Sequence, residues 1–107
     1  MDKGENPKTH TITITVDNDG NFSYDNPLIW VDHGDTIIWE CTNNCPFAIH
    51  LGWNSPLKKG RYRSEDGTRI EAEVKKNAQP GYYQYAAAVC IDKEIWIDDP
   101  PFIVKPG

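Results

Sequence analysis

Residues 9–16 have a period of two, in the order Thr-His-Thr-Ile-Thr-Ile-Thr-Val, with threonine at every odd position and apolar side chains at positions 12, 14 and 16. A period of two places the apolar members on one face of a β-strand. Shorter or less regular versions of this pattern recur along the chain, separated by clusters of Gly, Pro, Asn and Asp that favour turns. The strands that these patterns predict are 9–16, 22–24, 28–31, 36–41, 47–51, 69–74, 82–90 and 101–104.

The other segments fit no helix, because none of them has the apolar spacing of a helical face. Residues 52–68 are irregular, and residues 91–99 form a loop or a hairpin. Residues 1–8 are polar and are expected to be a flexible N-terminus. With 107 residues, the chain is long enough for one domain with its own core. We therefore expect a single all-β domain, a Greek-key β-sandwich of seven to eight strands.

Four segments, taken in order, resemble segments of one known family. They are the Gly-Asp turn that leads to Trp39 in residues 31–39, the Asn-Asn loop in 43–50, the aromatic strand start in 81–85, and the closing strand in 99–104. In this order and spacing they resemble the cupredoxins, the plastocyanin-like sandwiches. The resemblance covers roughly residues 9–105 and implies a cupredoxin-like fold.

The resemblance also implies where copper ligands would lie. A blue-copper site uses two imidazoles and one thiolate, with a weak axial thioether. Alignment on Gly81 puts Ala87 in the cysteine position, and Ile49 occupies the position of the first histidine. His50 is one residue away, and alternation along a strand turns it to the opposite face. No His or Met follows Cys90, so we expect the fold without a type 1 copper centre and without a bound cofactor.

Three cysteines leave at least one thiol unpaired within the monomer. The simplest interpretation is three buried thiols in a reducing compartment. A disulfide between Cys41 and Cys45, or between Cys45 and Cys90, is an alternative if the protein is exported. Another is an atypical metal site of Cys41, Cys45, His50 and Cys90, a ligand set that suits zinc or Cu(I).

A net charge of −5 disfavours nucleic acid and anionic membranes as partners, since both attract basic surfaces. No apolar run is long enough to span a membrane. The polar N-terminus has no apolar stretch of the kind found in signal peptides. The chain as it stands is therefore expected in the cytoplasm, or in the periplasm or outside the cell if a signal peptide has been removed.

Catalysis finds no support in the sequence. It has no Gly-x-Ser-x-Gly elbow and no glycine-rich phosphate loop. Glu71 and Glu73, with Arg69 beside them, have the spacing of a solvated strand face. His10 and His33, at a strand edge and in a turn, are also expected to be solvated.

Recognition by loops is the remaining interpretation. Trp53 and Trp96 fall in predicted loops, where exposed aromatic side chains mark binding surfaces. The alternative is that both tryptophans cover the end of the sandwich, since large apolar side chains are usually buried. The second candidate surface is basic and comprises Lys58, Lys59, Arg61 and Arg63.

The expected function is that of a non-enzymatic binding or accessory module that recognises a protein or a small ligand through its loops. A copper or zinc protein with an atypical Cys/His site is the alternative. A copper electron carrier is a weaker one.

Overall fold

The computed structural model describes residues 7–64 and 69–106, which form strands and connecting loops and no helix. The first six strands are β1 (Thr9–Val16), β2 (Phe22–Tyr24), β3 (Trp30–Val31), β4 (Thr36–Cys41), β5 (Phe47–His50) and β6 (Arg61–Arg63). The others are β7 (Arg69–Glu73), β8 (Gly81–Gln84), β9 (Ala86–Ile91), β10 (Glu94–Asp98) and β11 (Pro101–Val104). The expected all-β architecture is confirmed, but the expected number of strands is too low.

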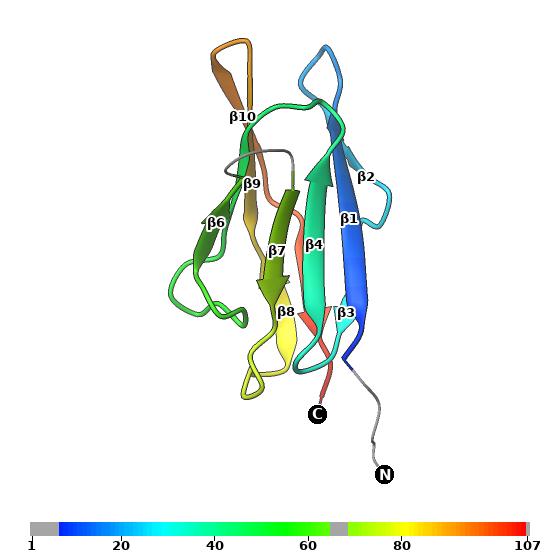
Figure 1. Cartoon of the computed structure of the whole chain (residues 1–107), viewed down its shortest axis with the longest axis vertical. Coiled ribbons are helices and arrows are strands. Elements are labelled where there is room, and N and C mark those ends of the chain that lie inside the picture. The colour runs from blue at the N-terminus through cyan, green and yellow to red at the C-terminus, as the bar shows by residue number, and fades with distance from the viewer. Residues whose placement is uncertain (1–6, 65–68, 107) are drawn as a thin grey trace.

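One layer of the sandwich is the four-stranded sheet β2-β1-β4-β7. Its central pair is parallel, with Thr9 opposite Thr36 and Ile14 opposite Cys41, whereas β2 and β7 add antiparallel strands on either side. The other layer consists of two smaller sheets, β10-β9-β5-β6 and β3-β11-β8. Figure 1 shows the two layers running along the longest axis of the molecule. The Greek-key connectivity stays a prediction.

The second layer is divided into two sheets because a long hairpin contributes β9 and β10 to one of them and β8 and β11 to the other. The predicted strand 82–90 is two strands, β8 and β9, which separate at Tyr85. There the Tyr85 amide donates to the carbonyl of Pro100 at 3.0 Å, and β10 and β11 separate at the same level. The predicted loop or hairpin 91–99 is the turn and the outer strand of this hairpin. These breaks, together with the short β6 inside the predicted irregular segment 52–68, raise the number of strands to eleven.

The core is centred on Trp39, which is fully buried as the sequence suggested. Its indole N–H donates to the hydroxyl of Tyr85 at 3.0 Å, and the two rings meet edge to face. Phe102 packs on the other side of Tyr85 with ring centroids 5.8 Å apart. Burial raises the pKa of Tyr85 to about 12, so the phenol stays neutral and joins the two layers at physiological pH.

The Gly-Asp turn is organised by the buried carboxylate of Asp35. Its oxygens accept hydrogen bonds from the amide of Asp32 at 2.8 Å and from the amide of Lys8 at 2.9 Å. They also lie 2.8 Å from Nε2 of His10. Burial alone would raise the pKa of Asp35, but the hydrogen bonds from Asp32, His10 and Lys8 outweigh it, and the pKa is lowered.

The expectation for the two histidines of this region is wrong. His10 and His33 were expected to be solvated, yet His10 pairs with Asp35 and Nε2 of His33 lies 2.7 Å from the carbonyl oxygen of Ala78. Residues 1–6 of the expected flexible N-terminus lie outside the described residues. Lys8, at its end, is held to Asp35 and also accepts a hydrogen bond from the amide of Thr36.

The molecule is elongated, with extents of 49 × 24 × 23 Å. One end carries the β1–β2 turn, the β4–β5 connection and the β9–β10 turn, and the start of β1 and the end of β11 lie at the other (Figure 1). Within the described ranges, no helix is long and apolar enough to cross a membrane.

Candidate functional site: the outer face of the β10-β9-β5-β6 sheet

The inner face of this sheet contains the two positions that resemble copper-ligand positions. Ile49 on β5 lies directly opposite Ala87 on β9, and both side chains are completely buried. His50 is exposed on the opposite face of β5, as alternation along a strand requires. The expected orientation of His50, opposite to that of Ile49, is confirmed.

The four candidate metal ligands do not converge. Cys41 is buried in the core, where its Sγ lies 3.7 Å from Oδ1 of Asn43. The thiol of Cys45 donates to the backbone carbonyl of Asn43 at 3.2 Å. Cys90 and His50 lie on the outer face of the other layer. Among residues 7–64 and 69–106, no three His, Cys, Asp or Glu side chains gather in a group that could hold a metal ion.

The cysteines are three free thiols, but the expectation that all are buried is wrong for two of them. Only Cys41 is buried, and Cys45 and Cys90 are partly exposed. Burial raises the pKa of the Cys41 thiol and outweighs a backbone hydrogen bond at Asn43 that lowers it, and the neighbouring Cys45 adds a smaller increase. Neither of the two disulfides considered from the sequence is formed.

The type 1 copper centre of the resembling family does not fit these side chains. Such a centre needs imidazole nitrogens and a thiolate, whereas Ile49 and Ala87 offer only hydrocarbon. Cys90 lies three residues beyond Ala87 on β9, and its side chain is on the outer face with Ala88. The inner space is filled by packed apolar residues, and these positions offer no donor atom to a copper ion.

Trp96 closes the end of the sandwich. It lies on β10 rather than in a loop, opposite the buried Val89. Its indole covers Gly20 in the β1–β2 turn, where a Cβ atom would come within 2.4 Å of the ring. The neighbouring Asp98 accepts a hydrogen bond from the hydroxyl of Tyr24 at 2.7 Å. Trp96 is therefore a structural side chain and is not available as a free aromatic anchor.

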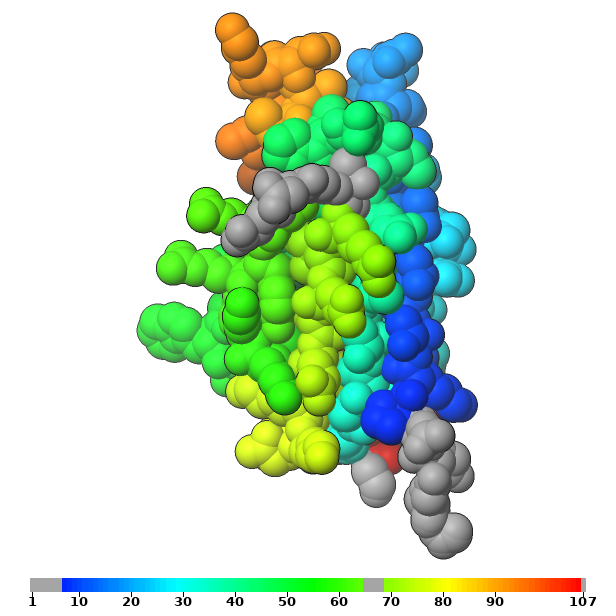
Figure 2. Space-filling model, in the orientation of Figure 1, coloured from blue at the N-terminus to red at the C-terminus, as the bar shows by residue number. Residues whose placement is uncertain are grey.

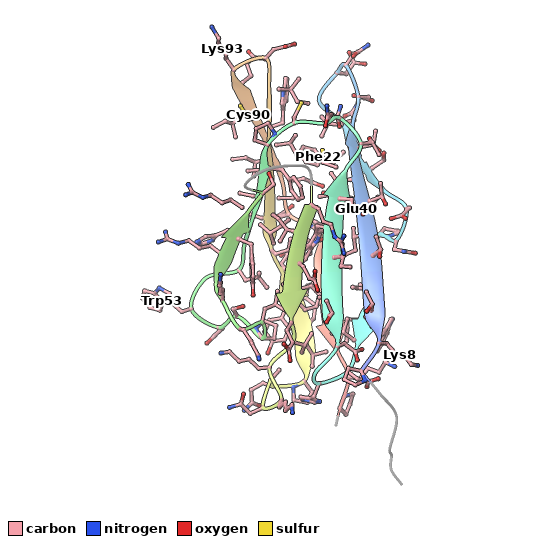
Figure 3. The ribbon with its side chains drawn as sticks, viewed as in Figure 1. Lys8, Phe22, Glu40, Trp53, Cys90 and Lys93 are labelled. Atoms are coloured by element: carbon pink, nitrogen blue, oxygen red, sulfur yellow. The ribbon has the colours of Figure 1, made fainter. Side chains whose placement is uncertain are left out.

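Trp53, unlike Trp96, does not pack against the rest of the protein. Its side chain is fully exposed, with a relative accessibility of 102%, so it does not cover the end of the sandwich. Figure 3 shows it pointing away from the molecule, far from Cys90. It borders a hollow of about 310 Å³ beside Tyr83 and Gln79.

The basic cluster is divided by the fold. The ammonium of Lys58 pairs with Glu73 at 3.2 Å. Arg61 and Arg63 lie on β6 with exposed side chains, and the Lys59 ammonium lies 5.8 Å from the centre of the Tyr62 ring. Figure 2 shows the side chains of the green segment that includes β6 standing out from one side of the molecule.

Cross-strand pairing aligns these arginines with an apolar surface. On the outer face, one row runs Ile97, Ala88, Ala48 and Arg63, across all four strands. The next row contains Ala86, His50 and Arg61. On the other side Ile95 lies opposite Cys90. Ile95 and Ile97 are each 67% exposed, an unusual exposure for large aliphatic side chains.

This surface is hollowed. A cavity of about 520 Å³, called the outer groove below, is lined by Pro46, Phe47, Ala48, Arg63, Ser64, Ala88, Cys90 and Ile95. A second hollow of about 630 Å³ shares Ala48 and Arg63 with it and adds His50, Lys59, Arg61 and Tyr62. Both volumes lie in the range of ligand sites in proteins. An apolar half and a basic half thus adjoin on one face.

The sequence reasoning found the basic half and missed the apolar half. Ile95 and Ile97 lie in segment 91–99, and its prediction as a loop or hairpin does not orient their side chains. A usable signal was present, because in Glu94-Ile-Trp-Ile-Asp98 two isoleucines flank Trp96 at strand spacing. If Trp96 faces inward, both isoleucines must face outward.

No family model matches the chain, and no curated protein matches its sequence. Among solved structures, it is similar to variants of amicyanin. A reduced Cu(I) form is 14% identical with a TM-score of 0.54, and an oxidised form is 15% identical with a TM-score of 0.55. Each comparison covers 89% of this chain and 82% of the other. At this identity the likeness concerns the fold alone, and it shows that this chain has a cupredoxin-like fold.

Proposed function

We propose that this protein is a non-enzymatic recognition module that binds a partner with the outer face of the β10-β9-β5-β6 sheet. The inner and outer faces of the β5–β9 pair both support this proposal. On the inner face, Ile49 and Ala87 fill aligned ligand positions with hydrocarbon. On the outer face, the same strands supply Ala48 and Ala88 to the outer groove.

The exposed isoleucines are the single observation that carries the proposal. Two aliphatic side chains on an edge strand, each two-thirds exposed, are unfavourable in water and invite association. Their position beside a groove with a basic border is typical of a binding surface with an apolar centre and a polar rim. The proposal moves recognition from the loops, where the sequence placed it, to a sheet face.

The proposed function is tested with two variants matched in chemistry. Ala88→Arg places a long charged side chain in the outer groove, and Thr13→Arg places the same side chain on the outward side of β1 in the opposite sheet. We expect partners captured from the source cells by the wild type and Thr13→Arg to be lost with Ala88→Arg. Equal capture by all three proteins would contradict the use of this face.

A metal titration tests the competing function of an electron carrier. Protein titrated with Cu(II), Cu(I) and Zn(II) is followed by absorption and by mass spectrometry. The proposal expects no intense visible band, since that band requires a copper–thiolate bond. A one-to-one copper complex with such a band, abolished by Cys90→Ser, would overturn the proposal in favour of a redox role.

A further inference from the structure

We infer that the outer groove accepts an acidic, amphipathic peptide segment of another protein, with apolar side chains along the groove and carboxylates on its basic border. This inference rests on the proposed function and names the class of partner. It follows from the shape of the floor, the chemistry of the two borders and the arrangement of charge.

The floor of the groove is made of small side chains. Ala88 and Ala48 are neighbours across β9 and β5, and both are partly exposed. Cys90 continues the floor along β9, and Ala86 lies on the same outer face next to the groove. Short side chains leave room for large apolar groups of a partner to approach the sheet, as in other grooves that bind peptides.

The two borders differ in chemistry. Ile95 and Ile97 on β10 form an aliphatic border, and Arg61 and Arg63 on β6 form a cationic one. Three strand spacings separate β10 from β6, about 14 Å. A peptide helix with its side chains is about 10–12 Å across, so one segment can contact both borders at once.

Among the described residues, no ion pair neutralises the cationic border. In the part of the chain that the structure describes, no carboxylate lies within ion-pair distance of Arg61, Arg63 or Lys59. The ion pairs found there are His10–Asp35, Lys58–Glu73, Arg69–Glu71 and Lys105–Asp32. Guanidinium groups prefer carboxylates, which they bind through two parallel hydrogen bonds. The protein as a whole is acidic, so this basic border would select the orientation of an acidic partner.

A second copy of this chain fits the face poorly. In a symmetric dimer both copies use the same patch. A two-fold axis across the strands places the arginines of β6 against the same arginines of the other copy. An axis along the strands places the arginines of one copy on Ile95 and Ile97 of the other copy. Neither arrangement sets a carboxylate of these outer-face rows against the guanidinium groups, whereas an acidic segment supplies one.

The test is a selection of random peptides on phage against the immobilised full chain, followed by binding measurements with the enriched peptides as synthetic probes. Selected sequences are expected to combine Leu, Ile or Phe with Asp and Glu. Their affinity should fall about tenfold or more in the variants Arg63→Glu and Ile97→Asp, and when salt is raised, because exposed charge pairs are screened. Trp53→Ala and Thr13→Arg should bind like the wild type.

The outcomes separate the inference from the proposed function. Peptides that need Ile97 but are neutral or basic would overturn the inference and leave a groove-binding module. Peptides that bind the groove variants as well as the wild type, or a selection without enrichment, would overturn both. A concentration-dependent dimer in sedimentation experiments, lost in Ile97→Asp, would assign the groove to a second copy and contradict the inference.

Discussion

Ile49 and Ala87 face each other across the β5–β9 pair with no exposed surface on either side chain. The pairing brings together the two positions that resemble copper-ligand positions in the sequence, and both carry only hydrocarbon. The same register forces His50 outward. The side chains on the inner face therefore contribute to the core, and the chemistry of these strands lies on the outer face.

This register predicts that substitutions at positions 49 and 50 change the stability of the protein by very different amounts. Ile49→His buries an imidazole among apolar side chains without a hydrogen-bond partner, and it should lower the free energy of unfolding by about 2–4 kcal/mol. His50→Ile changes an exposed side chain and should shift it by no more than about 0.5 kcal/mol. Urea unfolding of both variants measures the difference. Equal losses would show that the register of β5 is wrong.

The contact between Gly20 and Trp96 predicts a specific steric cost. Gly20 has φ +84° and no room for a Cβ beside the indole, so Gly20→Ala should lower stability by about 2–4 kcal/mol through backbone strain and overpacking. Gly52 provides the matched control, because it has φ +86° and nothing within 4 Å of an added Cβ. Gly52→Ala should cost only the backbone part, about 1–2 kcal/mol.

A double-mutant cycle isolates the steric part of that cost. In a Trp96→Ala background the indole is absent, so Gly20→Ala should lose no more stability than Gly52→Ala does. Thermal unfolding of the four proteins of the cycle gives the coupling energy. A coupling close to zero would mean that Trp96 does not cover the β1–β2 turn.

The sequence predicted most of the fold because the signals were local. The alternation in residues 9–16 requires no partner strand to be recognised, and β1 has the predicted bounds. The break at Tyr85 could not be predicted in this way. It depends on an amide of one strand bonding to Pro100 on another and on the packing of Tyr85 against Trp39, which are long-range contacts.

The candidate site was predictable only in part. Arg61 and Arg63 were identified from their charge, but the sequence placed them in a loop. Their position on β6, aligned with Ala48 and Ala88, depends on strand pairing that no local pattern contains. The prediction that the histidines are solvated was wrong for a similar reason, since the pairing of His10 with Asp35 joins residues 25 positions apart.

Asp35 predicts how stability depends on acid. Its pKa is lower in the folded protein than the ordinary value of 3.8, so its ionised form favours folding. This stabilisation is complete above about pH 5 and is lost as the pH falls below 3.8 toward the folded pKa. Asp35→Asn should lose about 1–3 kcal/mol at pH 7 and show a weaker decline in acid. Urea unfolding between neutral and acid pH tests this, and parallel curves for the two proteins would contradict it.

The three thiols should differ in reactivity with a thiol reagent. Cys45 and Cys90 are partly exposed, whereas Cys41 is buried with a raised pKa. We expect two thiols to react quickly in the native protein and the third to react about tenfold more slowly or only on unfolding. Cys90→Ser should remove one rapid equivalent, and Cys41→Ser should remove none. Three equally rapid equivalents would show that Cys41 is accessible.

The most direct test of recognition by the sheet face is the amide spectrum of the isotope-labelled protein during titration with the best selected peptide. Our account predicts that the resonances that shift belong to residues 46–48, 61–64, 86–90 and 94–98, and that Arg63→Glu abolishes the shifts. Shifts confined to Trp53 and the loop around it, or to the turns at the end near Trp96, would contradict it.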